Sequence, residues 1–233
     1  MPKIADKYGA HILTRTSEIE KKVRESNNTY DFEVMGGYRP LKKISIRIGL
    51  PVYRIENGRT KTFQKEYLAL HPDVPRDLFE RDTDASQAQK AQHEILKELV
   101  EDEDLLKEFK SGTKQTEPII VTSTGVVVNG NRRLCAWRTL YYNDPERFKH
   151  FEFINVAVLP NDCDDLEIRK IEKKLQIQKT LRAEYKWHNK AAMMQEEIKS
   201  GVSAKELANT YSMREKDVNQ LIDAFDYADK YLK

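Results

Sequence analysis

Two adjacent arginines follow a glycine turn in the middle of the chain, in the stretch Gly-Asn-Arg-Arg at 130–133. An apolar run (126–128) precedes this turn, and a helical pattern (132–142) follows it. Amides at the start of a helix lack partners inside the helix and attract anions, while glycine lets the backbone approach a ligand. Arginine binds phosphate through two hydrogen bonds, although a cation at a helix start is otherwise unfavourable. We therefore expect either an anion site or an exposed first turn with salt bridges to acidic neighbours.

Other familiar chemical motifs are missing from the sequence. The glycine turn lacks the Lys-Ser/Thr pair of a Walker A loop, and no Gly-x-Ser-x-Gly elbow occurs. The five histidines form no His-x-x-x-His pair, and the only cysteines are Cys135 and Cys163. We expect no metal site of the zinc type and leave the catalytic residues, if any, unassigned.

Composition limits the class of protein. The 233 residues are 39% hydrophobic and 33% charged, with a net charge of +2. No apolar run approaches the roughly 20 residues that a membrane span needs, and the N-terminus lacks the apolar core of a signal peptide. With two cysteines and no leader, we expect a cytoplasmic protein without a membrane partner. The near-balanced charge does not by itself indicate nucleic-acid binding.

The elements that would position the arginines form a mixed pattern. KISIRIGLPVYRI (43–55) and FEFINVAVL (151–159) indicate strands, and two apolar runs around Thr-Ser-Thr-Gly (122–125) indicate a hairpin. A helical stripe covers 85–109, with EDED interrupting it, and the chain appears helical in pattern from residue 164 onward. The sequence predicts an α+β protein: a mixed α/β N-terminal part followed by an all-α part.

The order of these motifs resembles the ParB/sulfiredoxin-like superfamily. A Pro-Ile-Ile-Val strand (118–121) precedes the strand, turn and Gly-x-Arg-Arg helix. LQIQKTLRAEYKWHNKA (175–191) and VSAKELANTYSMREKDVNQLIDAF (202–225) stand where ParB-type members carry a Gln-Arg segment and a helix-turn-helix. The resemblance covers residues 112–225, about half of the chain, and LPVYRIENGRT (50–60) is a weaker candidate for the family's first strand and arginine loop.

On this basis we divide the chain into three parts. Residues 1–40 are expected to be an arm with a short polar helix at 14–26. The arm is either a solvated tail or a phosphate-contacting segment, because the first fifty residues hold ten Lys/Arg against six Asp/Glu. Residues 41–165 are expected to form a ParB/sulfiredoxin-like nucleotide-binding domain. Residues 166–233 are expected to form a helical, helix-turn-helix-like domain.

The resemblance implies a pocket for a nucleoside triphosphate, CTP or ATP, with Mg²⁺ left open. Three stretches match the family's nucleotide motifs: a loop before the hairpin, the glycine turn, and the Gln-Arg segment. The implied nucleotide-binding residues are Thr113, Lys114, Gln115, Thr116, Asn129, Gly130, Asn131, Arg132, Arg133, Gln178 and Lys179.

The chain departs from the family at positions that matter for chemistry. Asn131 replaces the glutamate tied to hydrolysis in ParB, and an amide cannot act as a carboxylate base. The Glu-Asn pair that helps hold the metal falls on Leu175 and Gln176, and leucine cannot ligate Mg²⁺. Sulfiredoxin's catalytic cysteine also falls near Asn131, with Cys135 about a turn further in. Binding without turnover and catalysis by a group supplied elsewhere both stay open.

The C-terminal segment has the pattern of a helix-turn-helix on its own residues. Ser203 and Glu206 have the spacing of a capping box. We expect the second helix to expose Arg214, Lys216, Asn219 and Gln220, and Arg, Asn and Gln are the side chains that recognise base edges. Residues 201–233 nevertheless hold five Lys/Arg against six Asp/Glu, which favours a protein-interaction module as the alternative.

Three functions follow. The first is a ParB-like nucleotide-binding protein that associates with DNA, with a homodimer expected and a role in plasmid or phage maintenance or in defence. The second is an enzyme of the same fold, a nucleoside triphosphate hydrolase, kinase or nuclease. The third is a non-enzymatic interaction module. The helical pattern of the last residues, DAFDYADKYLK, leaves open that a further dimerisation element follows.

Overall fold

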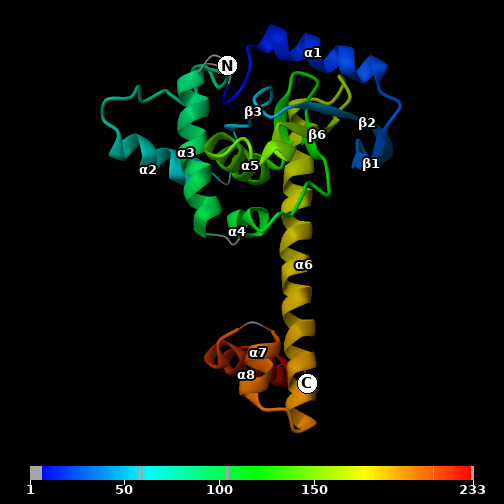
Figure 1. Ribbon diagram of the computed structural model, residues 1–233, viewed down its shortest axis with the longest axis vertical. Coiled ribbons are helices and arrows are strands. Elements are labelled where there is room, and N and C mark those ends of the chain that lie inside the picture. Colours follow the sequence, from blue (N-terminus) through cyan, green and yellow to red (C-terminus); the bar gives the residue numbers. More distant parts are fainter. Residues whose placement is uncertain (1–6, 57, 59, 103–104, 212, 232–233) are drawn as a thin grey trace. The chain divides into compact units, whose positions relative to one another are not determined.

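The computed structural model describes residues 7–231 except 57, 59, 103–104 and 212 (Figure 1). The chain divides into two compact units, residues 1–172 and residues 173–233. The first unit is a mixed sheet with helices, and the second is helical, so the predicted α+β class is confirmed at this level. No helix among the described residues is long and apolar enough to span a membrane.

A six-stranded sheet is the centre of the first unit, with the strand order β1-β2-β6-β4-β5-β3. The β3–β5 and β4–β6 pairs are parallel, and the other neighbours are antiparallel. The strands are β1 (Thr29–Val34), β2 (Gly37–Arg47), β3 (Val52–Tyr53), β4 (Ile119–Val121), β5 (Val126–Asn129) and β6 (Phe153–Val158).

Helices contact this sheet, and α6 continues from the first unit into the second. Figure 1 shows α3 alongside α5, and these two helices contact each other. The helices are α1 (Ile12–Glu25), α2 (Lys61–Leu70), α3 (Ser86–Asp102), α4 (Leu105–Lys110), α5 (Asn131–Asn143), the 3₁₀ helix η2 (Lys149–Phe151), α6 (Asp165–Lys199), α7 (Ala204–Thr210) and α8 (Glu215–Tyr231).

The alternation in the sequence of β2 explains how the sheet forms its core. Ile44 and Ile46 are buried while Arg47 is exposed, because residues two apart on a strand share a face. Their antiparallel partners on β6 are Val156 and Ile154, which are also fully buried. The period-2 pattern therefore sets the register of this pair.

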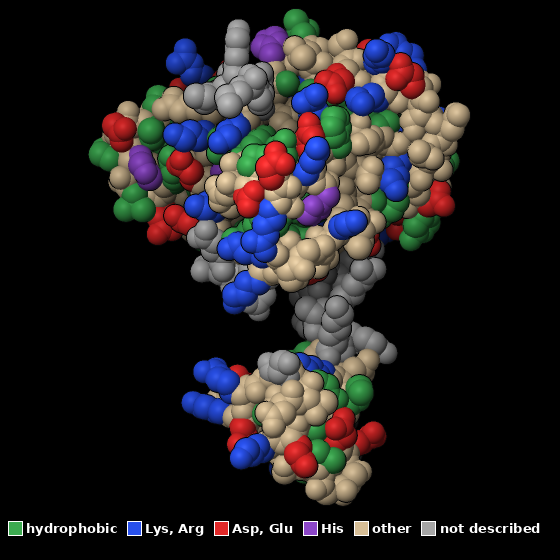
Figure 2. Space-filling model, in the orientation of Figure 1, with side chains coloured by type: hydrophobic (Ala, Val, Ile, Leu, Met, Phe, Trp, Pro, Cys, Tyr) green, Lys and Arg blue, Asp and Glu red, His purple; other side chains and the backbone are tan. Residues whose placement is uncertain are grey.

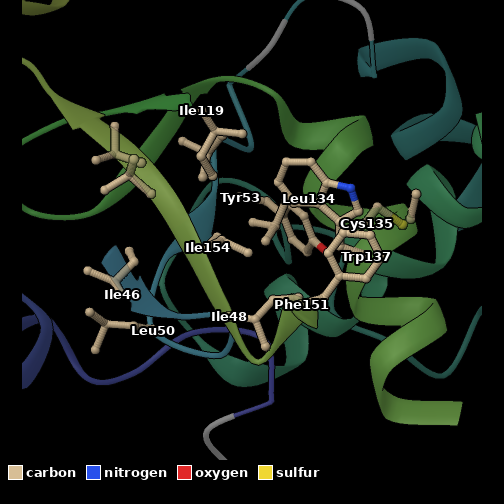
Figure 3. Close-up of a cluster of buried hydrophobic side chains, with 14 of the residues drawn as sticks. Ile46, Ile48, Leu50, Tyr53, Ile119, Leu134, Cys135, Trp137, Phe151 and Ile154 are labelled. Carbon is tan, nitrogen blue, oxygen red and sulfur yellow. The ribbon is translucent and has the colours of Figure 1, made fainter. Parts of the chain in front are cut away.

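Aromatic rings complete the core between the sheet and α5. The ring of Trp137 stacks on Phe151 with a centroid distance of 5.6 Å (Figure 3). The same ring meets Phe109 of α4 edge-on at 5.6 Å. All three side chains are buried. Burying a large aromatic side chain contributes about 3 kcal/mol, so this cluster fixes α4 and η2 against α5.

The expected arm over residues 1–40 differs most from the structure. Residues 12–25 form α1, and β1 pairs with β2 along its whole length. Arg15 and Ile19 are 1% exposed, and Val34 is 2% exposed. The short polar helix expected at 14–26 is therefore present as α1, but the burial of its inward residues and the pairing of β1 were not expected, because they depend on long-range contacts that no local pattern reveals.

Several local predictions are confirmed. The hairpin around residues 122–125 consists of β4 and β5, and the helix expected at 132–142 is α5. The stripe at 85–109 is divided into α3 and α4 near the acidic EDED. The single strand expected at 43–55 is instead two strands, β2 and β3, because a turn with a Leu50 N–H to Arg47 C=O bond of 2.9 Å and Pro51 separate them.

The second unit consists of the end of α6 with α7 and α8. Its core contains Met194, Leu207 and Val218, all fully buried. The capping box is confirmed: the Ser203 hydroxyl accepts from the Glu206 N–H at 3.2 Å, and the Ser203 N–H donates to the Glu206 carboxylate at 3.0 Å.

Candidate functional site

The start of α5 requires glycine on two counts. Gly130 has a φ of 110°, in the left-handed region, and a β-carbon there would lie 2.4 Å from Ile119 Cγ2. No side chain caps this end of the helix, and the first intrahelical bond runs from the Leu134 N–H to the Gly130 C=O at 2.8 Å. The positive end of the helix dipole is therefore not neutralised by a cap.

Arg133 links this helix start to the loop before β4. Its Nη1 donates to the Glu117 carbonyl at 3.2 Å. Burial lowers the pKa of Arg133, with Glu117 and Tyr30 acting in the opposite direction, and the guanidinium still keeps its charge at neutral pH. The structure thus brings one predicted arginine and the predicted loop to the same place. Arg132 is half-buried in the same turn.

The loop at 113–117 is held to the sheet by Gln115. The Gln115 Nε2 donates to the Asn155 carbonyl at 2.7 Å, and the Asn155 N–H donates to Gln115 Oε1 at 2.7 Å. This side chain was predicted to bind nucleotide, but both ends of its amide are engaged by main chain. Lys114 and Thr116 are exposed and Thr113 is half-buried, so these three have room to meet a ligand.

Asn131 is likewise occupied inside the fold. It is 8% exposed; its Nδ2 donates to the Val127 carbonyl at 3.1 Å, and its Oδ1 accepts from the Arg54 N–H at 3.4 Å. Its side chain joins β3, β5 and α5 rather than facing a ligand. Asn129, the last residue of β5, is half-buried and pairs with Ile120.

The third predicted nucleotide motif is not brought to this place by any described contact. Gln178 and Lys179 belong to α6 in the second unit, and their side chains lie outside the described residues. Their predicted role therefore stays a prediction.

Arg54 is the centre of a second group of charged side chains, which was not predicted from the sequence. Its side chain is 7% exposed, and the guanidinium lies 3.5 Å from Asp165 Oδ1 and 3.3 Å from Glu172 Oε1. It borders a pocket of about 380 Å³, which Thr83, Asp84, Ser123 and Asp165 also line. A sign of this role was present in the sequence, because the charged Arg54 stands between the apolar residues Tyr53 and Ile55, directly after a short strand.

A buried polar cluster lies between Tyr53, His93 and Cys135. The Tyr53 hydroxyl is 2.8 Å from His93 Nδ1, and Cys135 Sγ is 3.5 Å from the same nitrogen. Burial is the main cause that lowers the pKa of His93 to about 3 and raises that of Cys135 to about 12. The imidazole is neutral and the thiol protonated at neutral pH, so Cys135 has the properties of a packing residue and not of a nucleophile.

No protein-family model, curated protein or solved structure matches the chain. Within the described ranges, no group of three or more His, Cys, Asp or Glu side chains is arranged to hold a metal ion. Functional conclusions therefore rest on the geometry of the α5 start, of Arg54 and of α8.

The predicted recognition face on α8 is exposed but not uniformly basic. Lys216, Asn219 and Gln220 are exposed. Arg214 donates to both carboxylate oxygens of Asp217, at 2.8 and 2.9 Å. Figure 2 shows acidic and basic side chains intermingled on the visible face of each unit. A bidentate internal ion pair occupies the donors that would otherwise bind a phosphate or guanine.

Proposed function

We propose that the first unit binds the phosphates of a nucleoside triphosphate, CTP or ATP, at the start of α5. The observation that carries the proposal is an uncapped helix start, fixed by Gly130, with the Arg133 guanidinium held beside it by the Glu117 carbonyl. The amides of the first turn would donate to the phosphate oxygens, and Arg133 would offer its remaining N–H groups. This agrees with the resemblance to the ParB/sulfiredoxin-like superfamily.

The surrounding side chains fit binding better than turnover. Asn131 stands where ParB has its hydrolytic glutamate, and its side chain is engaged by main chain. Glu117, whose carbonyl accepts from Arg133, has an exposed side chain. We therefore propose a nucleotide-binding protein whose nucleotide state alters its domain arrangement, and we rank an enzyme of the same fold second. Release of inorganic phosphate or cleavage of DNA by the purified protein would reverse this order.

A calorimetric titration tests the phosphate site. CTP, ATP and GTP are titrated into the full chain, with and without Mg²⁺, and then into Arg133→Ala. Losing one charge-assisted arginine contact should weaken binding about 10- to 100-fold. Arg147→Ala is the matched control, because Arg147 is exposed outside the site and should bind as the wild type does. Equal affinities in all three proteins would refute the proposal.

We further propose that the second unit contacts DNA through α8. Asn219 and Gln220 would face base edges, and Lys216 would contact a phosphate. DNA affinity is measured by fluorescence anisotropy at several salt concentrations. Lys216→Ala should reduce the salt slope by about one, whereas Gln220→Ala should weaken binding without changing the slope. No change in either variant would remove α8 from the interface.

A protein-interaction module is the second candidate for this unit. Tyr227 and Met193 are 66% and 54% exposed, and Arg214 is paired with Asp217. Exposed large apolar side chains are common at protein interfaces. Sedimentation of the wild type and of Tyr227→Glu separates the candidates: a loss of self-association in the variant supports the interaction module, and a monomeric wild type that binds DNA excludes it.

A further inference from the structure

Arg54 touches the α5 start through its main chain and α6 through its side chain. Its N–H donates to Asn131 Oδ1 at 3.4 Å, and Asn131 is the first residue of α5. Its guanidinium lies within 3.5 Å of Asp165 and 3.3 Å of Glu172, both in the first two turns of α6. Three elements that are distant in the sequence therefore meet at one arginine.

The contact between Arg54 and Glu172 is electrostatic rather than a directed hydrogen bond. Nε and Oε1 are 3.3 Å apart, yet neither atom has a hydrogen-bond partner within the described residues. Glu172 is 18% exposed, whereas Asp165 is 78% exposed. Burial raises the pKa of Glu172, and Arg54 acts against that rise. The inner part of the cluster thus depends on charge that solvent screens little.

This cluster holds the first two turns of α6 in place. Asp165 and Glu172 are seven residues apart and so share one side of the helix, and Ile168 and Ile171 on these turns are buried. If these turns move away from Arg54, a guanidinium that is now 7% exposed loses both carboxylates. A buried charge without a partner is costly, so Arg54 would have to move with them. Its amide would then release Asn131, whose other bond orients the α5 start along β5.

We infer that Arg54 is a positioning residue that couples ligand affinity at the α5 start to the docking of the first two turns of α6. The inference rests on the proposed function, since it names how that same site is regulated. Arg54 itself does not touch the ligand. By reciprocity, phosphate binding at the α5 start strengthens the docking of residues 165–172 to the same degree.

Hydrogen exchange measured by mass spectrometry tests the docking without any ligand. Glu172→Gln keeps the shape of the side chain and removes its charge. Peptides covering residues 165–172 and 131–135 should exchange about tenfold faster in this variant than in the wild type. Lys170→Gln is the matched control, because it breaks only the exposed ion pair with Glu167 on the same turns and should leave exchange unchanged. The double variant Arg54→Met/Glu172→Met replaces the ion pair by apolar groups. It should restore slow exchange if the faster exchange of Glu172→Gln is caused by the unpaired charge of Arg54.

The same proteins are then titrated with ATP, CTP and inorganic triphosphate. We expect Glu172→Gln to bind about tenfold more weakly than the wild type and Lys170→Gln to bind equally well. Faster exchange in both peptides without nucleotide binding to any protein, wild type included, would support the contact network and refute the proposed function. Unchanged exchange in Glu172→Gln, or faster exchange at 165–172 with unchanged nucleotide affinity, would overturn the inference.

Discussion

A β-carbon at residue 130 would lie 2.4 Å from Ile119 Cγ2, so the Ile119 side chain packs against Gly130 and leaves no room for a side chain there. The glycine is therefore required by the fold even before any ligand is considered. A variant of Gly130 that fails to bind nucleotide would say little about phosphate recognition. Arg133, which reaches the site from the first turn of α5, is the better probe.

Gly130→Ala should lower the free energy of unfolding by about 3 kcal/mol. The left-handed φ costs a non-glycine residue about 1 kcal/mol, and overpacking against Ile119 adds about 2 kcal/mol. Urea denaturation measures the difference. Gly112→Ala is the matched control, because its φ is 102° and no atom lies within 4 Å of the added carbon. Gly112→Ala should lower the free energy of unfolding only by the cost of the left-handed φ, about 1 kcal/mol. Equal decreases in both variants would contradict the packing argument.

His93 should make stability depend on pH between 5 and 7. The folded protein holds its pKa at about 3, whereas an unfolded chain has the ordinary value near 6.5. Below about pH 6.5, His93 is therefore protonated in the unfolded chain but stays neutral in the folded chain. The free energy of unfolding consequently decreases as the pH decreases. The loss is at most about 1.4 kcal/mol per pH unit, or about 2 kcal/mol between pH 7 and 5.

Chemical denaturation of the wild type and of His93→Gln at both pH values checks this. The difference between pH 7 and 5 should shrink in His93→Gln, which cannot titrate. His11→Gln, a change at an exposed histidine, should keep the wild-type difference. A difference that persists in His93→Gln would assign the effect to other groups.

Arg138→Met should destabilise the protein by about 3 kcal/mol. The guanidinium is fully buried, donates to the Ile48 carbonyl at 2.9 Å and to the Pro51 carbonyl at 2.6 Å, and lies 4.7 Å from the Tyr53 ring centroid. Removing it leaves buried carbonyls without donors, although its own Nη1 already lacks a partner in the described structure. Thermal unfolding is measured for Arg138→Met and for the control Arg147→Met, which changes an exposed arginine. An equally large decrease in melting temperature in Arg147→Met would refute the argument.

The two thiols should differ in their access to alkylating reagents. Cys163 is half-buried and Cys135 fully buried, and burial is the main cause that raises both pKa values. Iodoacetamide at pH 8 should therefore modify Cys163 slowly and Cys135 only after unfolding. Mass spectrometry should show one modification in the native protein and two in guanidinium chloride. Rapid modification of Cys135 in the native protein would mean that α5 opens locally with a small free energy of opening.

The sequence was informative where structure is local. The hairpin at 122–125, α5 and the Ser203 capping box each depend on residues within a few positions of one another, and all were predicted. Arg15 was not, because its partners are Ala10, Thr124 and Asp84, two of them far along the chain. Arg54 was missed for the same reason.

The candidate site was predicted in part. The sequence placed the 113–117 loop and Arg133 together, as the Glu117 carbonyl contact shows. It could not tell that Gln115 and Asn131 would be engaged by main chain, since a polar side chain near a predicted site serves a ligand or the fold equally well on composition alone.

Gln115 is a polar side chain whose role in the fold limits which residues can replace it during evolution. Its carboxamide imitates a peptide group, with one donor and one acceptor in the place of a missing strand residue beside Asn155. Glutamate would lose the donor, and asparagine would be too short to span the gap. Natural variation at position 115 should therefore be narrow for architectural reasons, and a glutamine retained there in distant descendants would signal inheritance of this contact with β6 instead of inheritance of a substrate.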